Sequence, residues 1–170
     1  MPLSTAVPKS GADTLRNRIG EYVGYENASL RKSSDAAIRR HLITSIKDVL
    51  QQLESPYQAA DTEDQERLDS LLKSTKRKLN TICQSLNHPT YQQVSFFSGK
   101  RLSDREISRI YNLEQEMIEE IDHVQTEVAG MGKEKLEREI FEDHFLHISN
   151  FLDNVNQSLF EREALILGDV

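Results

Sequence analysis

Apolar residues recur every three or four positions along most of this chain, a spacing that predicts long amphipathic helices. The longest such stripe covers residues 107–128, where Glu114 fills the one gap. A stripe of this kind marks one face of a helix, which must be buried against other apolar surfaces. Its apolar members are Ile107, Ile110, Met117, Ile121, Val124 and Val128.

The residues around this stripe predict where its helix begins and ends. Ser103 and Glu106 match the S-x-x-E capping box, in which each side chain accepts a backbone N–H at the helix start. Leu102 is spaced to pack on Ile107 as a hydrophobic staple. Gly130 favours an end to the helix shortly after the stripe.

Three further stripes predict three more long helices. The first helix begins between residues 27 and 34 and ends before Pro56, whose ring disfavours a helical residue ahead of it. The second contains residues 68–86, where the apolar spacing alternates between four and three as in a heptad seam. The last helix begins near Lys133 and stops at Gly168.

These stripes predict an all-α fold, an elongated antiparallel four-helix bundle that forms a single domain over residues 14–167. A short extra helix is expected from Thr14 to about Tyr22, preceded by a flexible N-terminal tail over residues 1–13. The connection over residues 87–101 is long enough to cross the end of the bundle. An elongated dimer of helical hairpins is the other arrangement that the stripes allow.

Charge is distributed unevenly along the chain. Residues 1–101 carry a net charge of +4 and residues 102–170 a net charge of −11. Nucleic acid is therefore an unlikely partner for the acidic terminal hairpin, because phosphates need cations. The single Cys83 excludes an intramolecular disulfide, and the N-terminus has no apolar run typical of a signal peptide or membrane span. A cytoplasmic location without membrane association is expected.

Carboxylates and histidines form a polar strip beside the apolar faces of the last two predicted helices. Such side chains bind Fe, Mn or Zn, and Glu120-x-x-His123 matches the E-x-x-H element of di-iron bundles. With a turn near Met131, Glu120 is expected roughly opposite Glu142. The candidate metal ligands are Glu116, Glu120, His123, Asp143 and His147.

The second long helix argues against this metal site. A ferritin-like site takes a ligand from each of four helices, but this helix has no Asp, Glu or His between Asp69 and His88. A solvated, salt-bridged strip is therefore the favoured interpretation, and no cofactor is predicted.

Four apolar side chains gather in the connection over residues 87–101. They form either a lid over the bundle end, which the sequence favours, or a patch that contacts a partner protein. Aromatic anchors dominate interface energetics, so these residues are the best candidates for a contact surface. They are Tyr91, Val94, Phe96 and Phe97.

Basic residues cluster in parts of the first two long helices. An anion-binding or nucleic-acid-binding face is one interpretation, but no aromatic residues interleave with the cluster at residues 73–78. The favoured interpretation is a solvated face that attracts the acidic hairpin. The residues are Arg31, Lys32, Arg39, Arg40, Lys73, Lys76, Arg77 and Lys78.

Three short segments, Ile38–Ile43, Cys83–Leu86 and Phe160–Leu167, resemble pieces of the Rsd/AlgQ family of helical regulators, which sequester sigma factors. They cover under a fifth of the chain, and the aromatic-rich stretch that follows the cysteine motif in that family is absent. The resemblance implies a helical regulator and assigns no role to individual residues.

The chain contains no G-x-S-x-G, H-E-x-x-H, C-x-x-C or Walker pattern. Together with the helical seams, this predicts a non-enzymatic protein that acts by binding another protein, as a regulator, adaptor or chaperone. A homodimer is a further expectation. A metal-binding bundle is the alternative function, and a nucleic-acid-associated or sigma-factor-sequestering regulator ranks third.

Overall fold

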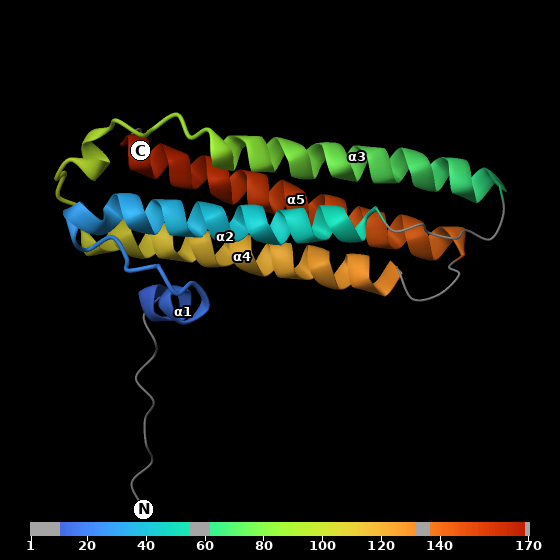
Figure 1. Cartoon of the computed structure of the whole chain (residues 1–170), viewed down its shortest axis with the longest axis horizontal. Helices are drawn as coiled ribbons and strands as arrows, with labels where there is room; N and C mark the ends of the chain where they lie inside the picture. Colours follow the sequence, from blue (N-terminus) through green and yellow to red (C-terminus); the bar gives the residue numbers. More distant parts are fainter. Residues whose placement is uncertain (1–10, 55–61, 132–136, 169–170) are drawn as a thin grey trace, which may run out of the picture.

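The computed structural model describes residues 11–54, 62–131 and 137–168, and this part of the chain contains helices and no strand. The predicted all-α fold is therefore confirmed. Four long helices lie side by side, and a short helix packs on their outside (Figure 1). The helices are α1 (Gly11–Arg18), α2 (Arg31–Gln52), α3 (Thr62–Asn87), α4 (Asp104–Met131) and α5 (Arg138–Leu167), with 3₁₀ turns η1 (Ala28–Leu30) and η2 (Ser95–Phe97).

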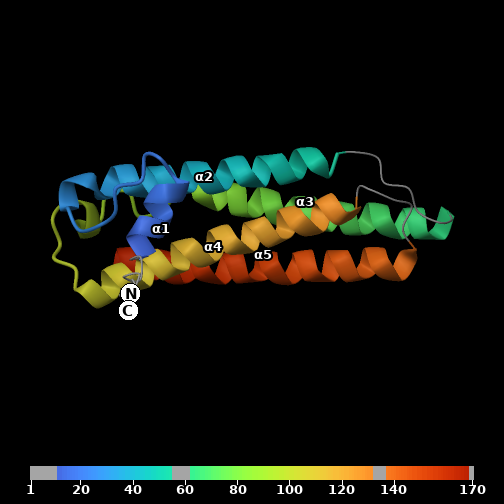
Figure 2. The same ribbon diagram turned by 90° about the horizontal axis from the view of Figure 1, so that it is seen from below.

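The connection between α3 and α4 crosses one end of the bundle diagonally. Consecutive long helices run antiparallel, as predicted, whereas the neighbours α2 and α4 run in the same direction (Figures 1 and 2). The ion pairs Arg67–Glu142 and Lys78–Asp153 show that the neighbours α3 and α5 are also parallel. Among the described residues, α3 and α4 each contact α2 and α5 but not each other, so they occupy opposite corners of the bundle. A long connection is therefore needed to join them.

The apolar stripes meet in one continuous core, in which α4 and α5 make the most extensive contact. The α4 stripe is buried from Ile110 to Val128, and Cys83 is a buried free thiol. Burying each large aliphatic side chain contributes roughly 1.5–3 kcal/mol to stability. None of the helices in the described ranges has the length and apolar character needed to cross a membrane. Other buried seam residues are Leu68, Leu79, Ile82 and Leu86 in α3, and Phe141, Phe145, Ile148, Leu152 and Val155 in α5.

Local sequence signals set the start of α4 and the end of α5 as predicted. The backbone N–H of Ser103 donates to Oε2 of Glu106 at 2.7 Å, and the backbone N–H of Glu106 donates to Oγ of Ser103 at 3.2 Å. This reciprocal pair is the capping box. At the C-terminal end of α5, Gly168 has a left-handed backbone with φ +85° and donates its N–H to the carbonyl oxygen of Ala164.

The predicted bounds of the short N-terminal helix, residues 14–22, are wrong. α1 covers residues 11–18, so three residues assigned to the tail are helical. A Cβ on Gly11 would lie 3.0 Å from the Cβ of Tyr111, so glycine allows this helix end to pack directly against α4. The helix ends early because the chain turns inward to bury Tyr22. Residues 1–10 of the predicted tail lie outside the described residues.

The predicted pairing of α4 with α5 is also wrong. α5 begins at Arg138, and the expected start near Lys133 lies outside the described residues. The longer connection moves the pairing along α5, so the side chain of Asn154 donates to Glu120 at 3.1 Å. Glu120 thus faces a residue twelve positions beyond the predicted Glu142.

Candidate functional site

A buried ion pair lies near one end of the bundle, where Glu114 interrupts the apolar stripe of α4. Glu114 is fully buried, and Arg162 of α5 is 1% exposed. The Nε atom of Arg162 donates to Oε1 of Glu114 at 2.8 Å. Each charge therefore has an opposite partner, as the burial of ions requires.

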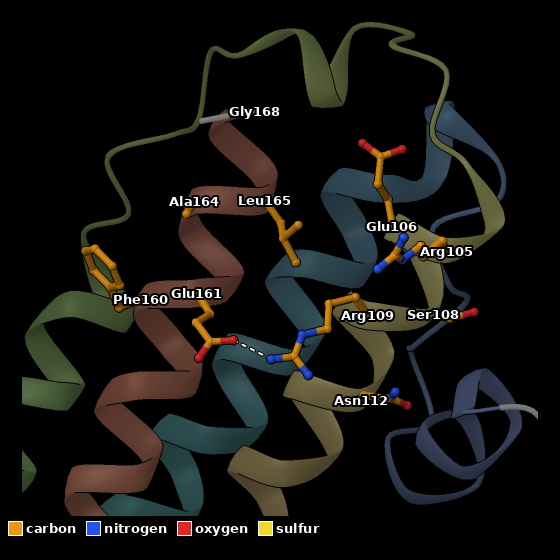
Figure 3. Close-up of a pocket in the computed structure, with 10 residues that line it drawn as sticks. All are labelled: Arg105, Glu106, Ser108, Arg109, Asn112, Phe160, Glu161, Ala164, Leu165 and Gly168. Atoms are coloured by element: carbon orange, nitrogen blue, oxygen red, sulfur yellow. Dashed lines mark hydrogen bonds and ion pairs between the residues drawn. The ribbon is translucent and has the colours of Figure 1, made fainter. Parts of the chain in front are cut away.

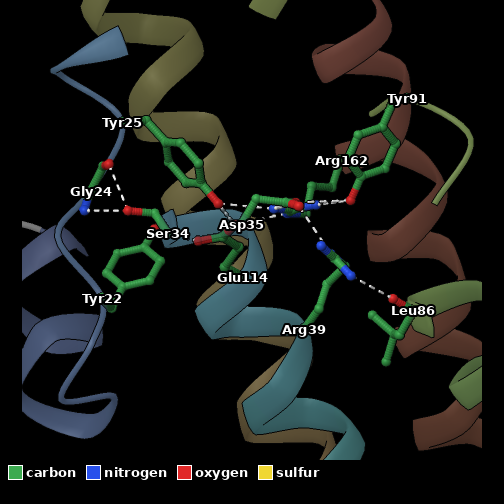
Figure 4. A network of polar contacts seen from close by, with 10 residues as sticks. All are labelled: Tyr22, Gly24, Tyr25, Ser34, Asp35, Arg39, Leu86, Tyr91, Glu114 and Arg162. Atoms are coloured by element: carbon green, nitrogen blue, oxygen red, sulfur yellow. Dashed lines mark hydrogen bonds and ion pairs between the residues drawn. The ribbon is translucent and has the colours of Figure 1, made fainter. Parts of the chain in front are cut away.

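Arg162 also reaches three other parts of the chain (Figure 4). Its Nη2 atom donates to Oδ1 of Asp35 in α2 at 2.8 Å and to the hydroxyl of Tyr25 at 2.9 Å. Its Nη1 atom donates to the hydroxyl of Tyr91 at 2.8 Å. One guanidinium thus joins α2, α4 and α5 to the two connections at this end.

Tyrosine hydroxyls complete the hydrogen bonding of both carboxylates. Tyr22 and Tyr25 each donate to an oxygen of Glu114 at 2.5 Å. Tyr91 donates to Oδ1 of Asp35 at 2.9 Å while it accepts from the guanidinium. A buried network satisfied in this way is rigid and specifies one arrangement of the elements that it joins.

The two buried carboxyl groups have pKa values shifted in opposite directions. Burial raises the pKa of Asp35, but Arg162 and then Arg39 attract the carboxylate more strongly, so its pKa lies below the ordinary value. At Glu114, burial outweighs the attraction of Arg162 and raises the pKa. Burial also raises the pKa of Tyr91 to about 12, so its hydroxyl keeps its proton at neutral pH. Arg162, Glu114 and Asp35 are all buried, so this network holds helices together rather than facing a substrate.

An open groove lies beside this network, on the outer surface between α4 and α5 (Figure 3). Its volume is about 790 Å³. The first turns of α4 form one wall and the last turns of α5 the other. The groove is lined by the apolar residues Phe160, Ala164 and Leu165 and by the polar residues Arg105, Glu106, Ser108, Arg109, Asn112 and Glu161, with Gly168 at its end.

Phe160 is an exposed aromatic residue that lines the groove. Its side chain is 73% exposed, the largest exposure of any large apolar residue in the described ranges. Across the groove, Arg109 forms an ion pair with Glu161 (Figure 3). Since Arg162 follows Glu161 in α5, the buried network also fixes the helical turn that forms this wall.

Each predicted metal ligand of α4 contacts a residue of α5, and within α4 Nδ1 of His123 also lies 3.8 Å from Oε2 of Glu120. Glu116 accepts a hydrogen bond from Ser158 at 3.3 Å, and Glu120 accepts one from Asn154. His123 stacks at a tilt on Phe151, with ring centroids 5.0 Å apart. These contacts are typical of a polar flank between two packed helices.

The predicted ligands of α5 are likewise not gathered with those of α4. Nδ1 of His147 lies 3.4 Å from Glu127, a residue not predicted as a ligand, and Nδ1 of His144 lies 2.5 Å from the same carboxylate. Asp143 is exposed. In the described part of the chain, no three such side chains are placed to hold a metal ion.

The aromatic connection between α3 and α4 covers the core. Tyr91 and Phe96 are buried, and Val94 and Phe97 are half-buried against the core. Phe96 packs edge-on against Phe97, with ring centroids 4.9 Å apart. The four residues therefore lie where a lid would place them, and a partner reaches Tyr91 or Phe96 only if the connection moves.

Two of the predicted basic residues take part in this end of the bundle. Arg31 is 3% exposed and donates to the carbonyl oxygens of Phe96 and Lys100. Arg39 donates to Asp35 at 2.9 Å. These two guanidinium groups bind the protein itself and are not offered to an external anion.

Arg162 and Phe160 were not predicted as functional residues, and Glu114 was predicted only as a gap in the apolar stripe of α4. The sequence did contain a signal for the two charged residues, Glu114 and Arg162. Glu114 occupies an apolar position of α4, and Arg162 lies three residues after Leu159 and four before Ile166, on the core face of α5. A charged residue at such a position needs an opposite charge. No comparable signal distinguishes Phe160, since scattered apolar residues are normal on protein surfaces.

Comparisons with models of known protein families, with curated proteins and with solved structures found no match to this chain. The resemblance to Rsd/AlgQ regulators is therefore not accompanied by a family match.

Proposed function

We propose that this protein is a non-enzymatic helical bundle that acts by protein–protein interaction, as a regulator, adaptor or chaperone, through the groove between α4 and α5. The observation that carries this proposal is the exposure of Phe160 beside the groove that contains Ala164 and Leu165. Aromatic residues next to apolar clefts are typical anchors of protein interfaces.

The groove carries two cations and two carboxylates, Glu106 and Glu161, so it can pair with charges of either sign on a partner segment. Arg105 and Arg109 are the only Lys or Arg residues in α4, and both line the groove. A helix with an apolar stripe would cover Phe160, and an acidic residue beside that stripe would lie near Arg105, since Arg109 is already paired with Glu161. In line with the sequence, we propose that this interaction takes place in the cytoplasm.

Site-specific photo-crosslinking tests this function. A photoreactive phenylalanine analogue at position 160, in cells that make the protein, should give adducts with another protein. The matched control places the analogue at Leu146, which is 58% exposed on the same helix but does not line the groove. Adducts with another protein at position 160 alone support the proposal. No such adduct at position 160, or equal adducts at both positions, would contradict it.

A further inference from the structure

We propose that the groove between α4 and α5 also receives a second copy of this chain, packed antiparallel across a two-fold axis. This inference rests on one part of the proposed function, the assignment of the groove as a contact surface. Two observations support it: the order of charges along α4, and the positions of Phe160 and Ala164 on α5. Both place the two-fold axis at the same height along the bundle.

One outward-facing strip of α4 carries cations near the start of the helix and anions further along. Arg105 lies in the first turn and Arg109 in the next, while Glu116 and Glu119 follow on the exposed side. The last turn has no basic residue. Asp104 and Glu106 in the first turn suit the positive end of the helix dipole, so the reversed order of charges is confined to this outward-facing strip. An external surface with the opposite gradient would compensate this arrangement.

A second α4 in antiparallel orientation supplies that gradient. If Asn112 of one copy faces Asn112 of the other, Arg105 faces Glu119 of the second copy, and the same pair forms again by symmetry. The amide of Asn112 both donates and accepts, so it can bind its own symmetry mate. Within one copy Arg105 and Glu119 are about 21 Å apart along the helix, so this pair forms only between copies.

The same axis gives a complementary contact on α5. The bonds from Arg162 to Glu114 and from Arg109 to Glu161 place Asn112 of α4 level with Arg162 of α5. Antiparallel packing about that level sets Phe160 of one copy over Ala164 of the other.

Ala164 has a small side chain and lines the groove. The exposed ring of Phe160 in one copy therefore lies over the small side chain of Ala164 in the other copy, and the two-fold axis repeats this contact. Two independent patterns, one of charge and one of shape, thus agree on a single axis.

A charge-swap experiment tests this register. Sedimentation equilibrium of the full chain should show a dimer that dissociates on dilution. Arg105→Glu and Glu119→Arg should each raise the dimer dissociation constant about tenfold, because each change turns two symmetry-related attractions into repulsions. The double variant should return to within about twofold of the parent, since it restores both pairs in reversed order.

Matched controls separate the register from net charge and from folding. Arg77→Glu changes the net charge by the same amount on the exposed side of α3 and should leave the dimer unchanged. Phe160→Ser should weaken the dimer without loss of helicity, since its side chain is mostly exposed. Circular dichroism of each variant shows whether the monomer is folded.

A monomer at every concentration would overturn this inference, and so would a dimer that the double variant fails to restore. A monomer whose position 160 crosslinks to another protein would leave the proposed function standing. A dimer that follows the charge swap, with crosslinks at position 160 only between copies, would support the inference and contradict the binding of another protein.

Discussion

Arg162 and Asp35 bind each other across the core, although 127 positions separate them in the sequence. The Nη2 atom of Arg162 lies 2.8 Å from Oδ1 of Asp35, and the two side chains are 1% and 5% exposed. Through this contact the last helix is fixed to the start of the first long helix. The same guanidinium binds Glu114, so the ends of three helices depend on one side chain.

Replacing Arg162 should therefore destabilise the fold strongly. Arg162→Met leaves the carboxylates of Asp35 and Glu114 buried without their main counter-charge, and we expect a loss of roughly 3–5 kcal/mol in the free energy of unfolding. Urea unfolding followed by circular dichroism measures this loss. The control is Arg109→Met, which removes a partly exposed ion pair with Glu161 and should change stability by less than about 1 kcal/mol. Similar losses for both variants would show that the buried network does not hold the helices together.

The pH dependence of stability should separate the two buried carboxyl groups. The folded-state pKa of Asp35 lies below its ordinary value of 3.8, so its stabilisation is complete above that value. That stabilisation is lost as the pH falls through the lowered pKa. Asp35→Asn should flatten the pH dependence of stability below about pH 4.

Glu114 should change the stability of the fold in the opposite direction to Asp35, and at higher pH. Its pKa is raised above the ordinary value of 4.5, so the folded state binds a proton first as the pH falls. Stability from this group should therefore increase as the pH falls from the raised pKa to the ordinary value, and Glu114→Gln should remove that increase. Urea titrations of the parent and both variants at a series of pH values test this. Identical pH profiles for all three proteins would contradict both assignments.

The capping box predicts a modest loss at the start of α4. Ser103→Ala removes the acceptor for the backbone N–H of Glu106 and should lower the free energy of unfolding by about 1 kcal/mol. Thermal unfolding provides the measurement, and Ser108→Ala on an exposed position of the same helix is the control. A larger loss for Asp104→Ala than for Ser103→Ala would move the N-cap by one residue.

Two phenylalanines at this end of the bundle should respond differently to truncation. Phe96 is fully buried, so Phe96→Ala should cost about 3–5 kcal/mol in the free energy of unfolding. Phe160 is 73% exposed, and Phe160→Ala should cost less than about 1 kcal/mol while it weakens association at the groove. Guanidinium unfolding and sedimentation measure the two effects. If Phe96→Ala were thermodynamically silent, the connection between α3 and α4 would not be a lid on the core.

The four long helices could be predicted from the sequence alone, because their signals act over a few residues. Apolar spacing of three and four positions brings side chains to one face of the same helix, whatever the rest of the chain does. The capping box at Ser103 and the left-handed turn at Gly168 are likewise local, and both were found where the sequence predicts them.

Which polar residues meet depends on the tertiary structure. The pairing of α4 with α5 depends on where the intervening turn lies, and that shift moved the partner of Glu120 from Glu142 to Asn154. The pairing of Arg162 with Asp35 and Glu114 depends on three helices that converge from distant parts of the chain. Whether an aromatic ring is buried, as at Phe96, or exposed, as at Phe160, depends on which neighbours cover it. These are long-range contacts, and helical periodicity within one segment carries no information about them.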